Sequence, residues 1–231
     1  MGSTKRIICI LGMHRSGTSC LTGSLQEAGL NLGQCHTWNP FNLKGNRENQ
    51  DFVDLHNEIL EANGGSWENP PENAKWSLQH KQRARELLAN FAEAEFVGFK
   101  DPRTLLVLEG WKELTDSLEF VGIFRHPDAV ADSLNRRSNM ARKEAIALWY
   151  TYNKYLYKEY KNHPFPILCF DDKQEIFEAK LNGLIEQLGL KAPCGPLQFY
   201  DHELKTSGAY PAPRLPWRAG RLYRHLRKSS I

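Results

Sequence analysis

The first clear pattern in the chain is a continuous apolar run at residues 7–11, which ends at Gly12. Aliphatic runs of this length are typical of parallel strands that are buried on both faces. From Thr18 to Gly29 the apolar residues recur instead at helical spacing, and Gly29 is a suitable C-terminal stop. The pattern therefore predicts a strand, a glycine-containing turn and a helix.

The same two patterns alternate along the rest of the chain. Strands are expected at 96–100, 118–124 and 165–170, and helices at 48–61, 78–91, 145–160 and 176–188. A further helix is expected to begin at Pro127, because proline suits the first helical turn. Segments 30–47 and 63–75 are rich in Asn, Gly or Pro and are expected to be loops. This order predicts an α/β fold with three layers, α/β/α, and a central parallel sheet.

Composition agrees with one such domain over residues 1–231. Hydrophobic residues make up 41% of the chain and charged residues 25%, which is an ordinary globular mixture. The net charge is only +3, and we expect no nucleic-acid partner. No run approaches the ~18 apolar residues of a membrane span. The apolar run near the N-terminus is also shorter than the core of a signal peptide.

The five cysteines indicate a reducing compartment. Their number is odd, they are scattered without a C-x-x-C pair, and three lie in apolar runs, where a free thiol behaves as a small hydrophobe. They are Cys9, Cys20, Cys35, Cys169 and Cys194. We therefore expect a cytoplasmic protein.

The turn after the first predicted strand has the pattern G-x-x-x-x-G-T-S, from Gly12 to Ser19. A Walker A loop would have lysine where Thr18 stands. A loop at a helix N-terminus still offers backbone N–H groups and a favourable dipole to an anion. Arg15 can supply the positive charge that the lysine would have brought. The missing lysine weakens an ATPase or GTPase interpretation, and a plain strand-to-helix turn is the alternative.

A second strand-to-helix junction repeats this arrangement. Arg125 follows the predicted strand 118–124, and Ser133 lies eight residues further, about two helical turns into the next helix. Ligands of doubly wound sheets bind beyond the carboxyl ends of the strands, so Arg125 and the first loop would face one crevice. A planar guanidinium and a hydroxyl both suit a phosphate. Taken singly, each residue is more often an ordinary surface or helix-face residue.

Together these segments resemble the sulfotransferase family of bacterial type, with its P-loop-like fold. Gly12–Ser19 resembles the loop that binds the 5′-phosphosulfate of 3′-phosphoadenosine 5′-phosphosulfate (PAPS), and Phe120–Ser133 resembles the strand and helix that bind its 3′-phosphate. Gly98–Arg103 resembles the corresponding strand end. The resemblance implies a donor site made of His14, Arg15, Ser16, Gly17, Thr18, Ser19, Arg125 and Ser133.

The resemblance also implies sulfuryl transfer from PAPS to a hydroxyl acceptor, with release of adenosine 3′,5′-bisphosphate and without a metal. The acceptor would be a carbohydrate, a lipid or a small molecule. Alignment and charge neutralisation would be the main contributions of the protein, and Arg15 and Lys100 are the cations placed there. Cytosolic members carry a catalytic His two residues after this Lys; here Pro102 stands at that position.

Three residues are therefore candidates for the general base. Glu48 is the first candidate, because related glycan and protein-tyrosine sulfotransferases place a catalytic Glu downstream of the first loop; it would equally suit the dipole of the predicted helix. His36 lies in the loop 30–47, which together with 63–76 is expected to form the acceptor pocket. Asp101 is the third candidate, or else it orients Lys100 or Arg103.

Two further features, an aromatic helix and a basic tail, each allow more than one interpretation. The predicted helix 145–160 is rich in Trp and Tyr, which favours packing on the sheet over lining of an acceptor pocket. The tail 205–231 is basic: a helix there could cover the 3′-phosphate, grip an anionic acceptor or touch an anionic membrane, or the tail could be solvated and frayed. The rival functions are a P-loop nucleotide kinase and a non-catalytic nucleotide-binding protein.

Overall fold

The computed structural model describes residues 5–38, 44–91, 94–115, 117–191, 195, 197–199 and 215–231. Its sheet has four parallel strands in the order β2-β1-β3-β4. These are β1 (Arg6–Leu11), β2 (Phe96–Lys100), β3 (Leu118–Phe124) and β4 (Ile167–Cys169). In register, Cys9 pairs with Phe99 on one side and with Phe120 on the other. The strand order reverses at β1 and β3, so the crevice beyond their carboxyl ends is the expected ligand position.

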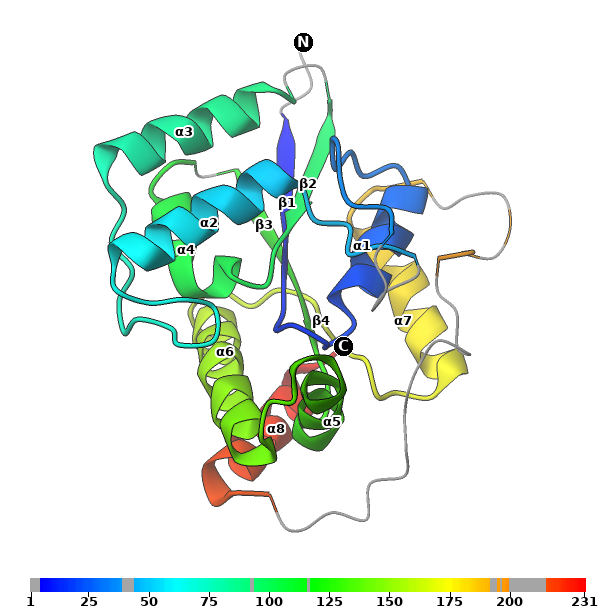
Figure 1. Ribbon diagram of the computed structural model, residues 1–231. Helices are drawn as coiled ribbons and strands as arrows, with labels where there is room; N and C mark the ends of the chain where they lie inside the picture. The colour runs from blue at the N-terminus through cyan, green and yellow to red at the C-terminus, as the bar shows by residue number, and fades with distance from the viewer. Residues whose placement is uncertain are drawn as a thin grey trace.

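Helices cover both faces of the sheet, as predicted (Figure 1). On one face α1 (Thr18–Glu27) and α7 (Gln174–Gln187) pack on Ile8, Ile10 and their neighbours. The other face is covered by α2 (Gln50–Ala62), α3 (Leu78–Ala89), α4 (Thr104–Lys112), α5 (Pro127–Ser138), α6 (Arg142–Asn162) and α8 (Trp217–Ser229). Successive side chains of a strand point to opposite faces, so the continuous run in β1 contributes to both cores.

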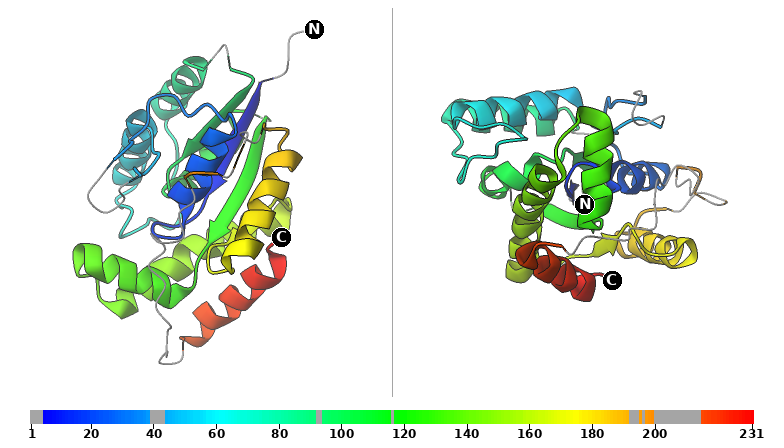
Figure 2. Two further views of the ribbon diagram at one scale, coloured as in Figure 1. Left: turned by 90° about the vertical axis from the view of Figure 1, so that its right-hand side faces the viewer. Right: turned by 60° about the horizontal axis from the view of Figure 1, so that its bottom comes forward.

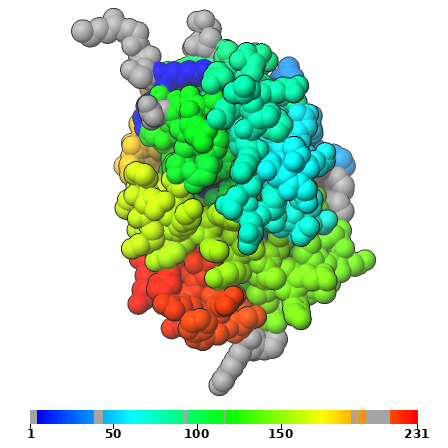
Figure 3. All heavy atoms as spheres, turned by 90° about the vertical axis from the view of Figure 1, so that its left-hand side faces the viewer, coloured from blue at the N-terminus to red at the C-terminus, as the bar shows by residue number. Residues whose placement is uncertain are grey.

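Figure 3 shows the face that carries α2, where atoms of α2 and α3 lie beside those of α4 and α6. Beneath it, the Phe52 ring stacks on Phe99 at 4.7 Å between centroids and on Trp111 at 5.6 Å. These aromatic contacts join α2, β2 and α4. Helix α4 was not predicted from the sequence, because its residues 104–108 are all buried and show no amphipathic period.

The aromatic helix α6 is mainly a packing element. Trp149 and Tyr152 are fully buried. The Tyr152 hydroxyl donates to the Trp67 carbonyl at 2.9 Å, and the Tyr155 hydroxyl donates to the Glu72 carbonyl at 2.8 Å. The helix therefore holds the segment 63–76 against the domain.

The C-terminal helix α8 lies beside α6 (Figure 2). It buries Ala219, Leu222 and Leu226 against the larger core. The Ile231 N–H then donates to the Ile167 carbonyl at 3.0 Å, next to strand β4. The tail from residue 215 onward is therefore docked, and the part of the predicted tail at 205–214 lies outside the described residues. Among the described residues, no helix has the length and apolar character to cross a bilayer.

Candidate functional site

The loop between β1 and α1, called here the phosphate loop (Gly12–Ser19), has an unusual backbone. Arg15 and Gly17 adopt left-handed conformations, with φ of 66° and 87°. A Cβ on Gly17 would lie 2.4 Å from the Phe170 ring, so glycine is required there. Among the described residues, no side chain caps the first turn of α1. Its backbone N–H groups and its dipole therefore favour an anion in this loop.

Most other side chains of the loop are buried. His14, Ser16 and Thr18 have exposed fractions of 8%, 0% and 4%, and Ser19 Oγ lies 3.5 Å from Lys100 Nζ. His14 Nε2 and Ser16 Oγ have no hydrogen-bond partner within the described part of the chain. Burial, reinforced by the positive charge of Arg103, holds the pKa of His14 well below its usual range. His14 is therefore neutral at pH 7, and its Nε2 and the Ser16 hydroxyl can still bind a ligand.

Arg15, Arg125 and Ser133, called here the nucleotide side, meet at the switch point of the sheet. Arg15 Nε donates to Ser133 Oγ at 2.8 Å, and an Arg125 amino group donates to the Arg15 carbonyl at 3.4 Å. Burial, followed by the charges of Arg137 and Arg125, lowers the pKa of Arg15 to about 10. The group is still a cation at neutral pH, and a bound anion would relieve the repulsion. The three side chains from separate segments are thus within reach of one ligand.

The nucleotide side is supported from behind by α6 and α8. Arg125 Nε lies 3.7 Å from Asp171 Oδ1, and Trp149 Nε1 donates to the Arg125 carbonyl at 2.9 Å. The Tyr223 ring of α8 meets the His126 ring edge-on at 4.8 Å. The C-terminal helix therefore buttresses the junction that carries Arg125.

The basic residues of α8 are mostly exposed. Arg218, Arg221 and Arg224 face solvent, whereas Arg227 forms an ion pair with Asp172. A role of these residues as a lid, an acceptor contact or a membrane contact stays a prediction.

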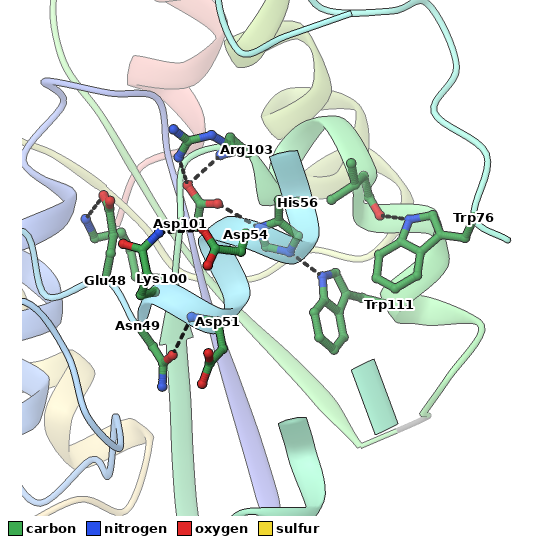
Figure 4. Close-up of polar contacts among 12 residues, drawn as sticks. Glu48, Asn49, Asp51, Asp54, His56, Trp76, Lys100, Asp101, Arg103 and Trp111 are labelled. Atoms are coloured by element: carbon green, nitrogen blue, oxygen red, sulfur yellow. Dashed lines mark hydrogen bonds and ion pairs between the residues drawn. The ribbon is translucent and has the colours of Figure 1, made fainter. Parts of the chain in front are cut away.

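Glu48, Lys100 and Arg103, called here the transfer side, lie at the carboxyl end of β2 (Figure 4). Lys100 Nζ is 2.7 Å from Glu48 Oε1, and the two side chains are only 1% and 12% exposed. The prediction that Glu48 opens a helix is wrong: α2 begins at Gln50, and the Asn49 side chain caps it by accepting from the Asp51 N–H. Glu48 therefore lies before the helix, and its carboxylate pairs with Lys100 rather than serving the helix dipole.

The two other candidate bases are placed differently. The exposed His36 is held through its backbone, since its N–H donates to the Glu48 carbonyl at 2.9 Å and its carbonyl accepts from Arg47. Asp101 is fully buried and bonds His56 at 2.7 Å and Arg103 at 2.8 Å. Asp101 thus contacts Arg103, one of the two cations that it was predicted to orient if it is not the base.

Sequence reasoning gave no role to His56 and left Arg103 as a residue that Asp101 might orient. The available signal was the Asp-Pro-Arg triplet directly after β2, which places a carboxylate and a guanidinium at the same strand end as Lys100. His56 offered no signal, because it lies among the apolar positions of an ordinary amphipathic helix. Among the described residues, no three His, Cys, Asp or Glu side chains converge in a way that could hold a metal ion.

Comparisons with known proteins bear on the fold. No protein-family model matches the chain, and no curated protein matches its sequence. A solved sulfotransferase domain from the Synechococcus PCC 7002 olefin synthase matches with a TM-score of 0.63 and 19% identity, over 98% of this chain and 97% of that one. A sulfotransferase domain from the curacin biosynthetic pathway matches with a TM-score of 0.62 and 18% identity, over 98% and 99%. The chain therefore has the α/β fold of these sulfotransferase domains, as the sequence predicted.

Proposed function

We propose that this protein transfers the sulfuryl group of PAPS to a hydroxyl acceptor and releases adenosine 3′,5′-bisphosphate. The observation that carries the proposal is the contact of Arg15 with Ser133 at 2.8 Å, with Arg125 beside it. This contact brings the phosphate loop and α5 within reach of a single ligand that has two anionic groups. A nucleotide with a 5′-phosphosulfate and a 3′-phosphate meets that description.

In this proposal the phosphate loop holds the 5′-phosphosulfate, through the N–H groups of α1 and the Ser16, Thr18 and Ser19 hydroxyls. Arg125 and Ser133 hold the 3′-phosphate, since a guanidinium and a hydroxyl can both donate to its oxygens. Arg15 and Lys100 neutralise charge on the phosphosulfate. Thr18 at the Walker lysine position is consistent with a donor that lacks a γ-phosphate.

Glu48 is the proposed base. The acceptor oxygen forms a bond to sulfur while the bond between sulfur and the 5′-phosphate oxygen breaks. The electron pair of the broken bond stays on the phosphate, and the proton of the acceptor hydroxyl passes to Glu48. Lys100 now bonds Glu48 at 2.7 Å. A bound phosphosulfate would compete for the Lys100 cation and so release the carboxylate for proton transfer. Donor binding and base activation would then be linked.

The acceptor is proposed to enter beside segment 63–76. A cavity of about 390 Å³ lies there, lined by Glu68, Ser138, Asn139, Met140, Glu144 and Leu148. Glu68 follows Trp67, whose ring lies 4.6 Å from the His14 ring of the phosphate loop. A polar, partly acidic lining suits an uncharged or cationic hydroxyl compound better than an acidic one.

The proposal is tested in two steps. Thermal shift with adenosine 3′,5′-bisphosphate, ATP and GTP should show stabilisation by the first ligand alone, because only a ligand that binds the folded state raises the melting temperature. Transfer of labelled sulfate from PAPS across a panel of hydroxyl acceptors should then give product. Stabilisation by ATP instead would favour a nucleotide kinase, and binding without transfer to any acceptor would favour a non-catalytic protein.

A cytoplasmic location is also part of the proposal. The cysteines that the structure describes, Cys9, Cys20, Cys35 and Cys169, are free thiols. Free thiols persist in a reducing compartment.

A further inference from the structure

A row of buried polar side chains runs from the core to the transfer side (Figure 4). Trp111 Nε1 of α4 donates to His56 Nε2 of α2 at 2.8 Å. His56 Nδ1 lies 2.7 Å from Asp101 Oδ2, and Asp101 Oδ1 accepts from an Arg103 amino group at 2.8 Å and from the Arg103 backbone N–H at 3.2 Å. Trp111, His56 and Asp101 are fully buried.

The direction of these hydrogen bonds follows from the chemistry of the groups. The Trp111 indole can only donate, so His56 Nε2 accepts and the ring proton sits on Nδ1, where it is donated to Asp101. Burial alone would raise the pKa of Asp101, but the hydrogen bond from His56 and the charge of Arg103 outweigh burial and lower it. Asp101 is therefore a carboxylate whose two oxygens are engaged by His56 and by Arg103.

Burying these charged and polar side chains in the core carries a desolvation cost. Apolar residues of similar size would be at least as stable, so a buried charged network is better explained by what it orients than by stability. Its outermost member is Arg103, whose side chain is 12% exposed. A guanidinium that is fixed by a buried carboxylate loses little freedom when it binds a ligand.

Arg103 lies between the carboxyl end of β2 and the start of α4, on the same side of the site as Glu48 (Figure 4). After burial, the charge of Arg103 is the next cause that lowers the pKa of His14 in the phosphate loop. Burial lowers the pKa of Arg103, but Asp101 and then Glu48 outweigh it and raise that pKa. Arg103 Nε is buried and has no hydrogen-bond partner within the described residues. One amino group of the guanidinium is thus bound to Asp101, while the Nε–H remains a donor that a ligand could use.

We propose that Arg103 binds the sulfuryl oxygens during transfer, and that Asp101, His56 and Trp111 are positioning residues that aim it. This inference rests on the proposed function. Arg103 forms and breaks no covalent bond; it donates hydrogen bonds to oxygens on sulfur while the acceptor bond forms and the phosphate bond breaks. Charge-assisted hydrogen bonds of this kind are about twice as strong as neutral ones.

The test compares two ligands that differ only in the sulfuryl group. Calorimetry without acceptor measures the affinities of wild type and Arg103→Met for adenosine 3′,5′-bisphosphate and for PAPS. The variant should lose about tenfold or more in PAPS affinity, as expected for a hydrogen bond to a charged group, and keep its affinity for the bisphosphate. Equal losses for both ligands, or no loss for either, would overturn the role of Arg103. Failure of the wild type to bind either ligand would instead refute the proposed function.

Two substitutions of His56 test the positioning role. His56→Leu removes the donor to Asp101 and should reproduce the selective loss of PAPS affinity and of kcat. His56→Asn keeps an N–H near the position of Nδ1 and should restore part of both. His163, which has a 79% exposed side chain, provides the matched control His163→Asn, which should behave as wild type.

If His56→Leu does not fold, His56→Asn and Arg103→Met still decide the matter. A wild-type ratio of PAPS to bisphosphate affinity in both of these variants would refute the positioning role. So would a loss of stability in His56→Asn that leaves that ratio and kcat unchanged.

Discussion

The nucleotide side and the transfer side hold their cations in different ways. On the nucleotide side Arg15 bonds the neutral hydroxyl of Ser133, and Arg125 lies 3.7 Å from the carboxylate of Asp171. On the transfer side Lys100 and Arg103 each bond a carboxylate oxygen, at 2.7 Å and 2.8 Å. In the first arrangement Arg15 lies near the charges of Arg137 and Arg125, and a bound anion would relieve that repulsion. On the transfer side each cation stays paired with a carboxylate until a ligand competes for it. This arrangement suits groups that stabilise charge as the sulfuryl group is transferred.

The largest effect is expected for Glu48→Gln, which should lower turnover without lowering nucleotide affinity. Glu48→Gln removes the proposed base, so turnover should fall roughly 10²–10⁴-fold while adenosine 3′,5′-bisphosphate still binds. Steady-state kinetics and calorimetry on the same preparation measure both. Glu61→Gln, at the exposed end of α2, is the control and should have normal turnover. Near-normal turnover in Glu48→Gln would remove this residue from the role of base.

The second effect tests whether α8 supports the nucleotide side. Tyr223→Ala removes a half-buried ring from the His126 junction and should lower the free energy of unfolding by about 2 kcal/mol. Affinity for the bisphosphate should fall as well, whereas Trp217→Ala on the same helix, where the side chain is 69% exposed, should change neither quantity. A stability loss in Tyr223→Ala with unchanged affinity would show that α8 does not position Arg125.

A third, smaller effect concerns the backbone of the phosphate loop. Gly17→Ala should cost about 1–2 kcal/mol in unfolding free energy for a left-handed alanine, and the clash with Phe170 should also displace the loop and weaken bisphosphate binding. Gly64→Ala provides a matched control, since Gly64 has φ of 72° with no atom within 4 Å of the added Cβ. Both variants should melt earlier, but only Gly17→Ala should lose affinity. Equal affinities in the two variants would argue against an anion in this loop.

The smallest effect is expected at Ser133. Ser133→Ala removes one hydroxyl and should weaken bisphosphate binding by about 1 kcal/mol without affecting the affinity for AMP. Ser117→Ala, at the exposed residue just before β3, is the control. A similar loss for both nucleotides would show that Ser133 does not act at the 3′-phosphate.

The contrast between the two sides also explains what the sequence could predict. The two arginines of the nucleotide side have local signals in the sequence. Arg15 lies in the glycine loop directly after β1 and Arg125 directly after β3, so the strand pattern alone brings them to one edge. The transfer side depends on contacts between distant segments, since His56 bonds a carboxylate 45 residues away and accepts from an indole 55 residues away. Helix α4, which carries that indole, also lacks the periodicity that would have predicted it.

The most direct test of the account compares adenosine 3′,5′-bisphosphate with AMP by calorimetry, in wild type and in Arg125→Ala. The two nucleotides share the 5′-phosphate and differ in the 3′-phosphate alone. If Arg125 binds the 3′-phosphate, wild type should bind the bisphosphate about tenfold or more tightly than AMP, and Arg125→Ala should abolish most of that difference while AMP binding persists. Equal affinity of the wild-type protein for the two nucleotides would contradict the assignment of the nucleotide side.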